Sequence, residues 1–174
     1  MNAAGWTALG TWVLVVGTLA AVYWQVRQQR EINSANTVML LHDRFESSLM
    51  RNQRKQLCLT LKMGKWIDQR DDEVLVFLET LGLLTRQRIL NEDMVWSEFC
   101  WEVVRYYAAL TRDRNQITHL REASHDKTLY AEFEWLSNRL LELDCLQREV
   151  SREVVIPNQA EISNFLDDEI ALVP

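Results

Sequence analysis

The stretch LYAEFEWLSNRLLEL, residues 129–143, decides the fold class, because its large apolar residues recur along one face of a helix. They follow one another at intervals of 4, 3, 4 and 3 residues: Leu129, Phe133, Leu136, Leu140 and Leu143. This spacing is typical of a helix that packs its apolar face on a bundle, whereas a half-buried strand alternates apolar and polar residues. The stretch therefore predicts an α-helix with one buried face.

Two more helices are predicted upstream of this stretch. The first follows the N-cap candidates Asp71 and Asp72, ends near Thr85, and has apolar positions at helical spacing: Val74, Phe77, Leu78 and Leu81. The second is capped by Asn91, and the acidic residues Glu92 and Asp93 suit the positive end of its dipole. Its apolar stripe consists of Val95, Phe99, Val103, Tyr106 and Leu110.

Proline and glycine are scarce, which argues against a fold built from strands. Proline occurs only at Pro157 and Pro174, and Gly82 is the only glycine between residues 65 and 156. Folds rich in strands need such residues at many turns. The segment from Leu57 to Met63 alternates apolar and polar residues, so a strand is the alternative there, but a lone strand would have no partner. We therefore expect an all-α fold.

The N-terminal region has the composition of a transmembrane helix. Residues 1–26 contain no charged side chain and no histidine, and the 19 residues from Trp6 to Trp24 are almost wholly apolar. As a helix this run is roughly 28 Å long, close to the hydrocarbon thickness of about 30 Å. A cleaved signal peptide is the alternative, but its apolar core is usually shorter. The expected membrane anchors are the aromatic residues Trp6, Trp12, Tyr23 and Trp24.

The residues around this run predict its orientation and its contacts. Arg27 and Arg30 follow it directly, so the positive-inside rule places the rest of the chain in the cytoplasm. Gly10 and Gly17 lie on one side of the run, where small residues let two such helices approach closely and form a homo-oligomer. Beyond the run, a stripe predicts that the helix continues: Val38, Leu41, Phe45 and Leu49.

Charge divides the chain beyond the run. From Arg27 to Lys65 there are eight cations and three anions, although the whole chain has a net charge of -6. This distribution suits contact with the lipid bilayer as a partner, and the alternative is a solvated helical face whose charges are balanced elsewhere in the fold. The acidic remainder disfavours nucleic acid. We expect a transmembrane anchor (1–26), a basic helical stalk (27–65), a helical bundle (66–156) and an acidic tail (157–174). The tail is either a short helix that closes the bundle or a mobile segment that binds a partner.

The sequence lacks the usual signatures of catalysis. It has no phosphate-binding glycine loop, no nucleophile elbow and no histidine spacing typical of a metal site. We therefore expect no catalytic residue, no metal and no cofactor. Two histidine–aspartate pairs leave a hydrolase as a remote alternative: His42 with Asp43, and His125 with Asp126. Three scattered cysteines are typical of buried thiols in a reducing compartment: Cys58, Cys100 and Cys145.

The best candidate for a ligand site is a group of arginines after the aromatic helix, namely Arg112, Arg114 and Arg121. Arginine binds phosphate and carboxylate groups through paired hydrogen bonds. Cations near a helix C-terminus are also favoured by the helix dipole, and that alternative needs no ligand.

Three segments carry a resemblance to a known family, from about residue 71 to residue 140. They read DDEVLVFLETLGLL, NEDMVWSEFCWEVVRYYAAL and LYAEFEWLSNRL, with Ile117 and Arg121 between the last two. This pattern resembles a domain-of-unknown-function family of small bacterial membrane proteins. The resemblance implies one N-terminal span, a cytosolic helical domain and a bacterial inner membrane location. One departure is the turn TRQRIL, which contains Arg86 and Arg88 but no glycine.

Two functions fit these features. The first is a membrane-anchored helical scaffold or adaptor that binds an unidentified membrane or cytosolic protein, or assembles with itself. The second is an effector in a bacterial signalling or defence pathway, whose helical domain binds a small anionic ligand.

Overall fold

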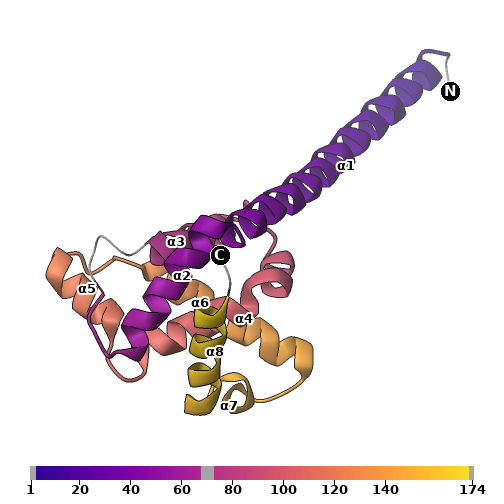
Figure 1. Cartoon of the computed structure of the whole chain (residues 1–174). Helices are drawn as coiled ribbons and strands as arrows, with labels where there is room; N and C mark the ends of the chain where they lie inside the picture. Colours follow the sequence, from indigo (N-terminus) through magenta and orange to yellow (C-terminus); the bar gives the residue numbers. More distant parts are fainter. Residues whose placement is uncertain (1–2, 68–72, 173–174) are drawn as a thin grey trace.

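The computed structural model describes residues 3–67 and 73–172, with side chains from residue 18 onward. Within these ranges the chain is all-α, without a strand, as the sequence predicts. Figure 1 shows the described helices in chain order: α1 (Ala3–Phe45), α2 (Ser48–Lys62), α3 (Glu73–Arg86), α4 (Glu92–Thr111), α5 (Gln116–Ser124), α6 (Ala131–Arg148), α7 (Arg152–Val155) and α8 (Gln159–Ala171).

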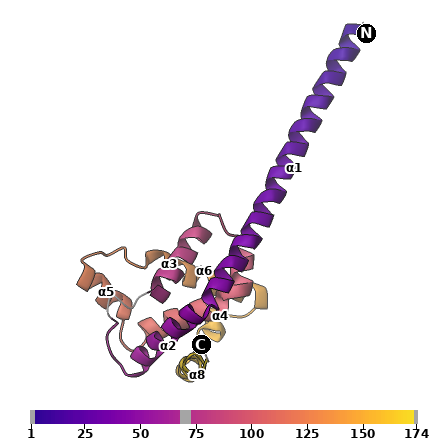
Figure 2. The ribbon, with the colours of Figure 1, turned by 45° about the horizontal axis from the view of Figure 1, so that its top comes forward.

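α1 is one continuous helix of 43 residues. Its N-terminal part extends away from the body, and only its last turns lie against it (Figures 1 and 2). The side facing the body carries the buried residues Ser34, Val38 and Phe45. The predicted continuation of the N-terminal helix is therefore confirmed.

Of the aromatic residues predicted to anchor the chain in the membrane, the structure describes the side chains of only Tyr23 and Trp24. Tyr23 and Trp24 are highly exposed, with 71% and 66% of their surface accessible. The side chains of Trp6 and Trp12, and the surroundings of Gly10 and Gly17, lie outside the described part of the chain. Over the part of the chain that the structure describes, no helix combines the length and apolar character needed to cross a membrane.

The chain bends between α1 and α2, at Glu46 and Ser47. The Ser47 side chain caps α2 by accepting a hydrogen bond from the backbone N–H of Met50. Residues 57–62 belong to α2, so the helix prediction for this segment is confirmed and the strand alternative is wrong. The bend also changes the direction of the apolar stripe, and Leu49, predicted to be buried, is 67% exposed.

α3, α4 and α6 form the centre of the body. The whole predicted stripe of α4 is buried, and Asn91 caps this helix by accepting hydrogen bonds from the N–H groups of Asp93 and Met94. On α6, Phe133, Leu136 and Leu140 are buried. Leu143, and Leu129 just before the helix begins, are partly buried against the same core. The N-cap candidates of α3, Asp71 and Asp72, lie outside the described residues.

α3 and α6 approach each other very closely at Gly82. A Cβ atom at this position would lie 2.3 Å from the backbone oxygen of Glu132, so only glycine fits without a shift of the backbone. Beside this contact, the Glu79 carboxylate accepts a hydrogen bond from the backbone N–H of Phe133 at 2.7 Å. Glu79 thus caps α6, whose N-cap residue Tyr130 makes no side-chain cap.

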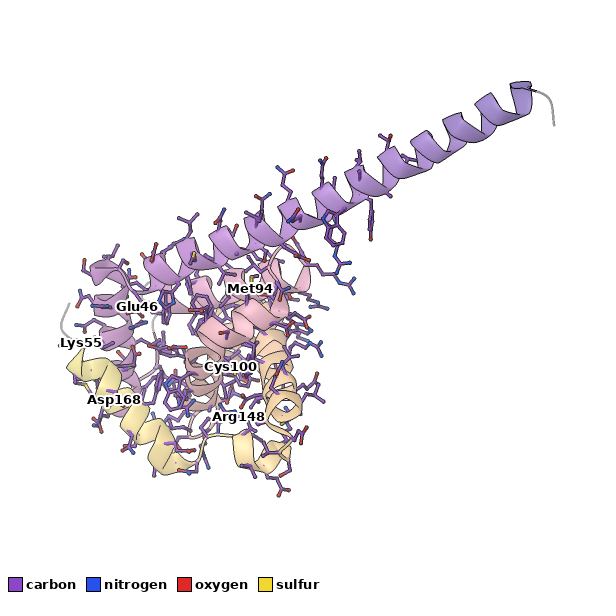
Figure 3. The ribbon with its side chains drawn as sticks, turned by 90° about the vertical axis from the view of Figure 1, so that its right-hand side faces the viewer. Glu46, Lys55, Met94, Cys100, Arg148 and Asp168 are labelled. Atoms are coloured by element: carbon purple, nitrogen blue, oxygen red, sulfur yellow. The ribbon has the colours of Figure 1, made fainter. Side chains whose placement is uncertain are left out.

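α8 closes the body against α2 and α4 (Figure 3). Ile162, Phe165 and Leu166 are buried, and Asn158 and Glu161 form a capping box at its start. Of the two alternatives for the acidic tail, the structure therefore supports the helix that closes the bundle.

Candidate functional site

The most unusual side chain in the body is Arg54 on α2, which is only 2% exposed. Its Nη1 donates to Oε1 of Glu46 at 2.9 Å, and its Nε lies 3.0 Å from Oε2 of Glu169. Its guanidinium group lies over the Phe45 ring, 4.1 Å from the ring centre. Glu46, labelled in Figure 3, lies at the bend after α1, so one arginine joins this bend, α2 and α8.

Two side chains extend this cluster towards α4. The Tyr106 hydroxyl donates to Oε2 of Glu169 at 2.8 Å, and the Cys58 thiol lies 3.9 Å from the Tyr106 oxygen. Burial raises the pKa of Cys58 to about 12 and raises the pKa of Tyr106 well above its usual range. Since only the thiolate is a good nucleophile, Cys58 is a buried polar partner and not a reactive thiol.

The carboxyl groups of the cluster differ in their pKa values. Burial alone would raise the pKa of Glu46, but hydrogen bonds and charges from Arg54 and Arg51 lower it below its usual value. For Glu169 burial dominates, and its pKa is raised although Arg54 lies beside it. Burial also raises the pKa of Glu102, which faces the same group of charges.

This arrangement is suited to hold helices together. Each carboxylate that contacts Arg54 has a further donor, which is Arg51 for Glu46 and Tyr106 for Glu169. Paired and hydrogen-bonded charges of this kind tolerate burial, whereas removal of one partner leaves a charge that is costly to bury. We therefore regard the Arg54 cluster, defined as Glu46, Arg54, Tyr106 and Glu169, as an ionic joint between α8 and the body.

The structure separates the three arginines predicted to bind an anion. Arg112 and Arg114 line one cavity of about 260 Å³ together with Lys62, between the ends of α2 and α4 and the start of α8. Arg112 donates to the backbone oxygen of Pro157 and Arg114 to that of Gly64, both at 2.7 Å. Arg121 is not part of this cavity lining, and it donates to Leu129 and Glu134 instead.

The histidine–aspartate pairs have separate surroundings. His42 Nδ1 lies 3.7 Å from Glu98 of α4, and Asp126 accepts hydrogen bonds from the N–H and hydroxyl of Thr128. His125 occupies the left-handed position that ends α5. Within residues 3–67 and 73–172, no three histidine, cysteine or acidic side chains gather closely enough to hold a metal ion.

Comparison with known proteins identifies the domain. Residues 11–140 match the family model described as "Domain of unknown function (DUF4760)". The chain belongs to the DUF4760 family. No curated protein and no solved structure matches it. A domain of unknown function is therefore found, as the resemblance implied, while the family match carries no information on a membrane span or a bacterial origin. The match reaches much further towards the N-terminus than the segments that carried the resemblance.

The DUF4760 match places the ionic joint at the edge of the family domain. Glu46, Arg54 and Tyr106 lie inside the matched residues, whereas Glu169 and all of α8 follow them. A helix outside the match thus supplies one carboxylate to an arginine buried within it. Because Glu169 is 7% exposed, this contact is part of the interior of the molecule.

Sequence reasoning missed the Arg54 cluster, although α2 contains a signal for it. Met50, Arg54 and Leu57 follow one another at helical spacing, so the arginine stands in the middle of an apolar stripe. A charged residue in a buried stripe requires a partner. The sequence does not reveal that partner, since Glu169 is 115 residues away and only the position of α8 brings it near.

Proposed function

We propose that this DUF4760 protein is a single-span helical scaffold of the bacterial inner membrane, whose body lies in the cytoplasm and binds or assembles other proteins. One observation carries the proposal: α1 leaves the body as an unbroken helix, and the large apolar side chains of its projecting segment are covered by no other described part of the chain. Within the described part of that helix they are Leu19, Val22, Tyr23, Trp24 and Val26, each at least 47% exposed.

The sequence of α1 agrees with this location. The exposed apolar turns continue the uncharged run that begins before them, and the first cations, Arg27 and Arg30, come immediately after. A contiguous apolar surface on a projecting helix favours contact with lipid or with another apolar helix. The Gly10 and Gly17 side is proposed as the surface for self-association.

Membrane insertion is tested by alkaline extraction of the tagged full-length protein from bacterial membranes. Val15→Arg with Leu19→Arg puts two charges at the centre of the run, each costing about 3 kcal/mol in a bilayer. We expect this variant to move to the soluble fraction. Ile32→Arg with Met39→Arg, on the same helix beyond the run, is the matched control and should stay in the pellet. Extraction of the unchanged protein at high pH would refute the anchor.

Assembly is tested by crosslinking in native membranes, followed by affinity purification and mass spectrometry. A stoichiometric second protein supports an adaptor, and a crosslinked oligomer of this chain alone supports self-assembly. Gly10→Leu with Gly17→Leu should abolish the oligomer, because the larger side chains keep the helices apart. If the protein is recovered only as a monomer, the scaffold proposal is wrong.

The second candidate, an effector that binds a small anionic ligand, has the support of the cavity lined by Lys62, Arg112 and Arg114. Both arginines already donate to backbone oxygens, so their free donors would have to bind the ligand. Phosphate binding by the full-length protein, measured by calorimetry, tests this candidate. Arg112→Ala with Arg114→Ala should abolish the binding, whereas Arg121→Ala should leave it unchanged.

A further inference from the structure

An open cleft of about 950 Å³ lies where α1 leaves the body. One wall is α1, the opposite wall is the turn between α3 and α4, and Arg139 of α6 contributes to its lining. The lining also contains Arg30, Asn33 and Arg88. Its two carboxylates are already paired, Glu31 with Arg27 and Glu92 with Arg139. Figure 2 shows this turn beside the lower part of α1.

The turn has a backbone conformation that presents Arg88 to solvent. Arg88 has a φ of 58°, in the left-handed region that glycine usually occupies at the end of a helix. Its N–H donates to Thr85 at 2.9 Å, and the N–H of Ile89 donates to Leu84 at 3.0 Å, which completes a tight helix-ending turn. The segment TRQRIL thus forms a tight turn although it contains no glycine, because Arg88 takes the left-handed conformation instead. Ile89 beside it is 51% exposed.

The arginines of the cleft differ in whether they already have an ion-pair partner. Arg139 pairs with Glu92 and Glu142. Arg30 and Arg88 make no ion pair within the described residues. At the start of α4, the N–H of Asn91 donates to Ser34, and those of Asp93 and Met94 donate to the Asn91 side chain, so these three donors are already used. The two guanidinium groups are thus the donors that the cleft offers to an anion.

The cleft lies a short distance along α1 beyond the apolar run, and this distance indicates which anions can reach it. Arg30 lies six residues after Trp24, which is about 9 Å along a helix. If Trp24 marks the edge of the hydrocarbon, the polar layer of the bilayer extends roughly 5 to 8 Å beyond it. Long arginine side chains readily bridge the remaining distance. The cleft therefore opens at the level of lipid phosphates.

From this geometry we infer that the cleft binds the phosphate of an anionic phospholipid between Arg30 and Arg88. Guanidinium groups recognise phosphate through paired hydrogen bonds, and the amide of Asn33 adds a further donor in the same lining. Ile89 then enters the apolar edge of the headgroup layer. This inference rests on the proposed membrane anchor and goes beyond it, because it fixes which face of the body touches the bilayer.

The test uses the full-length protein in nanodiscs of neutral phosphatidylcholine with a minor share of anionic phosphatidylglycerol. Native mass spectrometry counts the lipids that stay bound. We expect a preference for the anionic lipid of about thirtyfold, which corresponds to about 1 kcal/mol for each of the two arginines. Arg30→Gln with Arg88→Asn should abolish it. Asparagine is chosen because it tolerates the left-handed backbone, and circular dichroism checks that the helices remain.

The matched control is Arg44→Gln with Lys127→Gln, which removes the same charge from exposed residues outside the cleft lining. It should retain the preference. Equal retention of both lipids by the unchanged protein, or an equal loss in both variants, overturns the lipid site while the anchor stands. Failure of the unchanged protein to insert into purely neutral nanodiscs refutes the anchor itself.

Discussion

The contact between α3 and α6 and the contact between α2 and α8 hold helices together by different chemistry. At Gly82 two backbones meet, and no charge takes part in the close approach. At Arg54 the helices are joined through a buried arginine and a carboxylate with a raised pKa. The first contact depends on shape at Gly82 itself, and the Glu79 cap and the Arg86–Glu132 ion pair lie beside it. The second depends on charge, so it responds to pH and to the loss of a single group.

The two contacts also differ in whether they lie within the residues that match the family. Gly82 and Glu132 both lie within residues 11–140, whereas α8 lies beyond them. The centre of the DUF4760 domain is thus held by close packing, and the following helix is held by an ionic joint. We expect that α8 can be released while the centre remains folded, and four experiments test this contrast.

The largest effect is expected for Arg54→Met. This substitution leaves Glu46 and Glu169 without their shared cation. Because breaking a buried ion pair typically costs 3 to 5 kcal/mol, we expect the free energy of unfolding to fall by about 4 kcal/mol. Hydrogen exchange should speed up in α8 more than in α6. Arg51→Met is the control, because Arg51 pairs with the same Glu46 but is 36% exposed, and it should cost about 1 kcal/mol or less. Equal exchange in α6 and α8 would contradict the contrast.

Gly82→Ala should destabilise the whole body by about 3 kcal/mol, since the new methyl group overlaps the backbone of Glu132. Urea unfolding in mild detergent measures the loss, and hydrogen exchange should increase in α3, α6 and α8 together. Gly64→Ala is the comparison, because no atom lies within 4 Å of its added Cβ. Its φ of 63° still costs about 1 kcal/mol for alanine. Similar losses in both variants would show that the close approach at Gly82 is unimportant.

Asn91→Ala removes the cap of α4, the helix that touches both contacts. A lost N-cap costs about 1 kcal/mol, and the remaining packing of α4 should keep the body folded. The thermal unfolding midpoint of the full-length protein measures this effect. Asn115→Ala, which removes the equivalent cap from the shorter α5, should shift the midpoint less. A larger shift for Asn115→Ala would show that the body depends more on α5 than on α4 for its stability.

The smallest effect is the pH dependence of the ionic joint. The pKa of Glu169 is raised in the folded protein, so the folded state binds this proton more tightly than the unfolded state. Its ionisation therefore lowers stability as the pH rises through the folded pKa. Compared with Glu169→Gln, the unchanged protein should gain stability when the pH falls from 7 towards 5. A constant difference between their urea midpoints at the two pH values would contradict this.

Much of the fold could be predicted from local patterns. Helical spacing gave α4 and α6 because each has one continuous apolar face, and Asn91 marked the start of α4. Leu49 shows where such reasoning ends. Its stripe is regular in the sequence, but the bend at Glu46 and Ser47 gives α2 a new direction, and no local pattern encodes that change.

The candidate site was less predictable, because it depends on residues far apart in the sequence. Of the arginines that the sequence singled out after α4, Arg112 and Arg114 line one cavity. The sequence did not reveal that Arg121 pairs with Glu134 on α6. The Arg54 cluster depends on contacts over longer distances in the sequence, since Arg54, Tyr106 and Glu169 meet only after α2, α4 and α8 pack beside the bend that carries Glu46.

Because α1 is one unbroken helix, the direction in which the body faces about the helix axis depends on the number of residues between its N-terminal part and the body. Between Trp24 and Ser34 each residue turns the helix by about 100° and advances it by 1.5 Å. One inserted residue would turn the body by about 100° relative to the N-terminal part of α1, whereas seven would return it to within about 20° of its original orientation. Under the proposed membrane anchor, the number of residues in this segment, more than their identity, therefore determines which surface a neighbour in the same membrane meets.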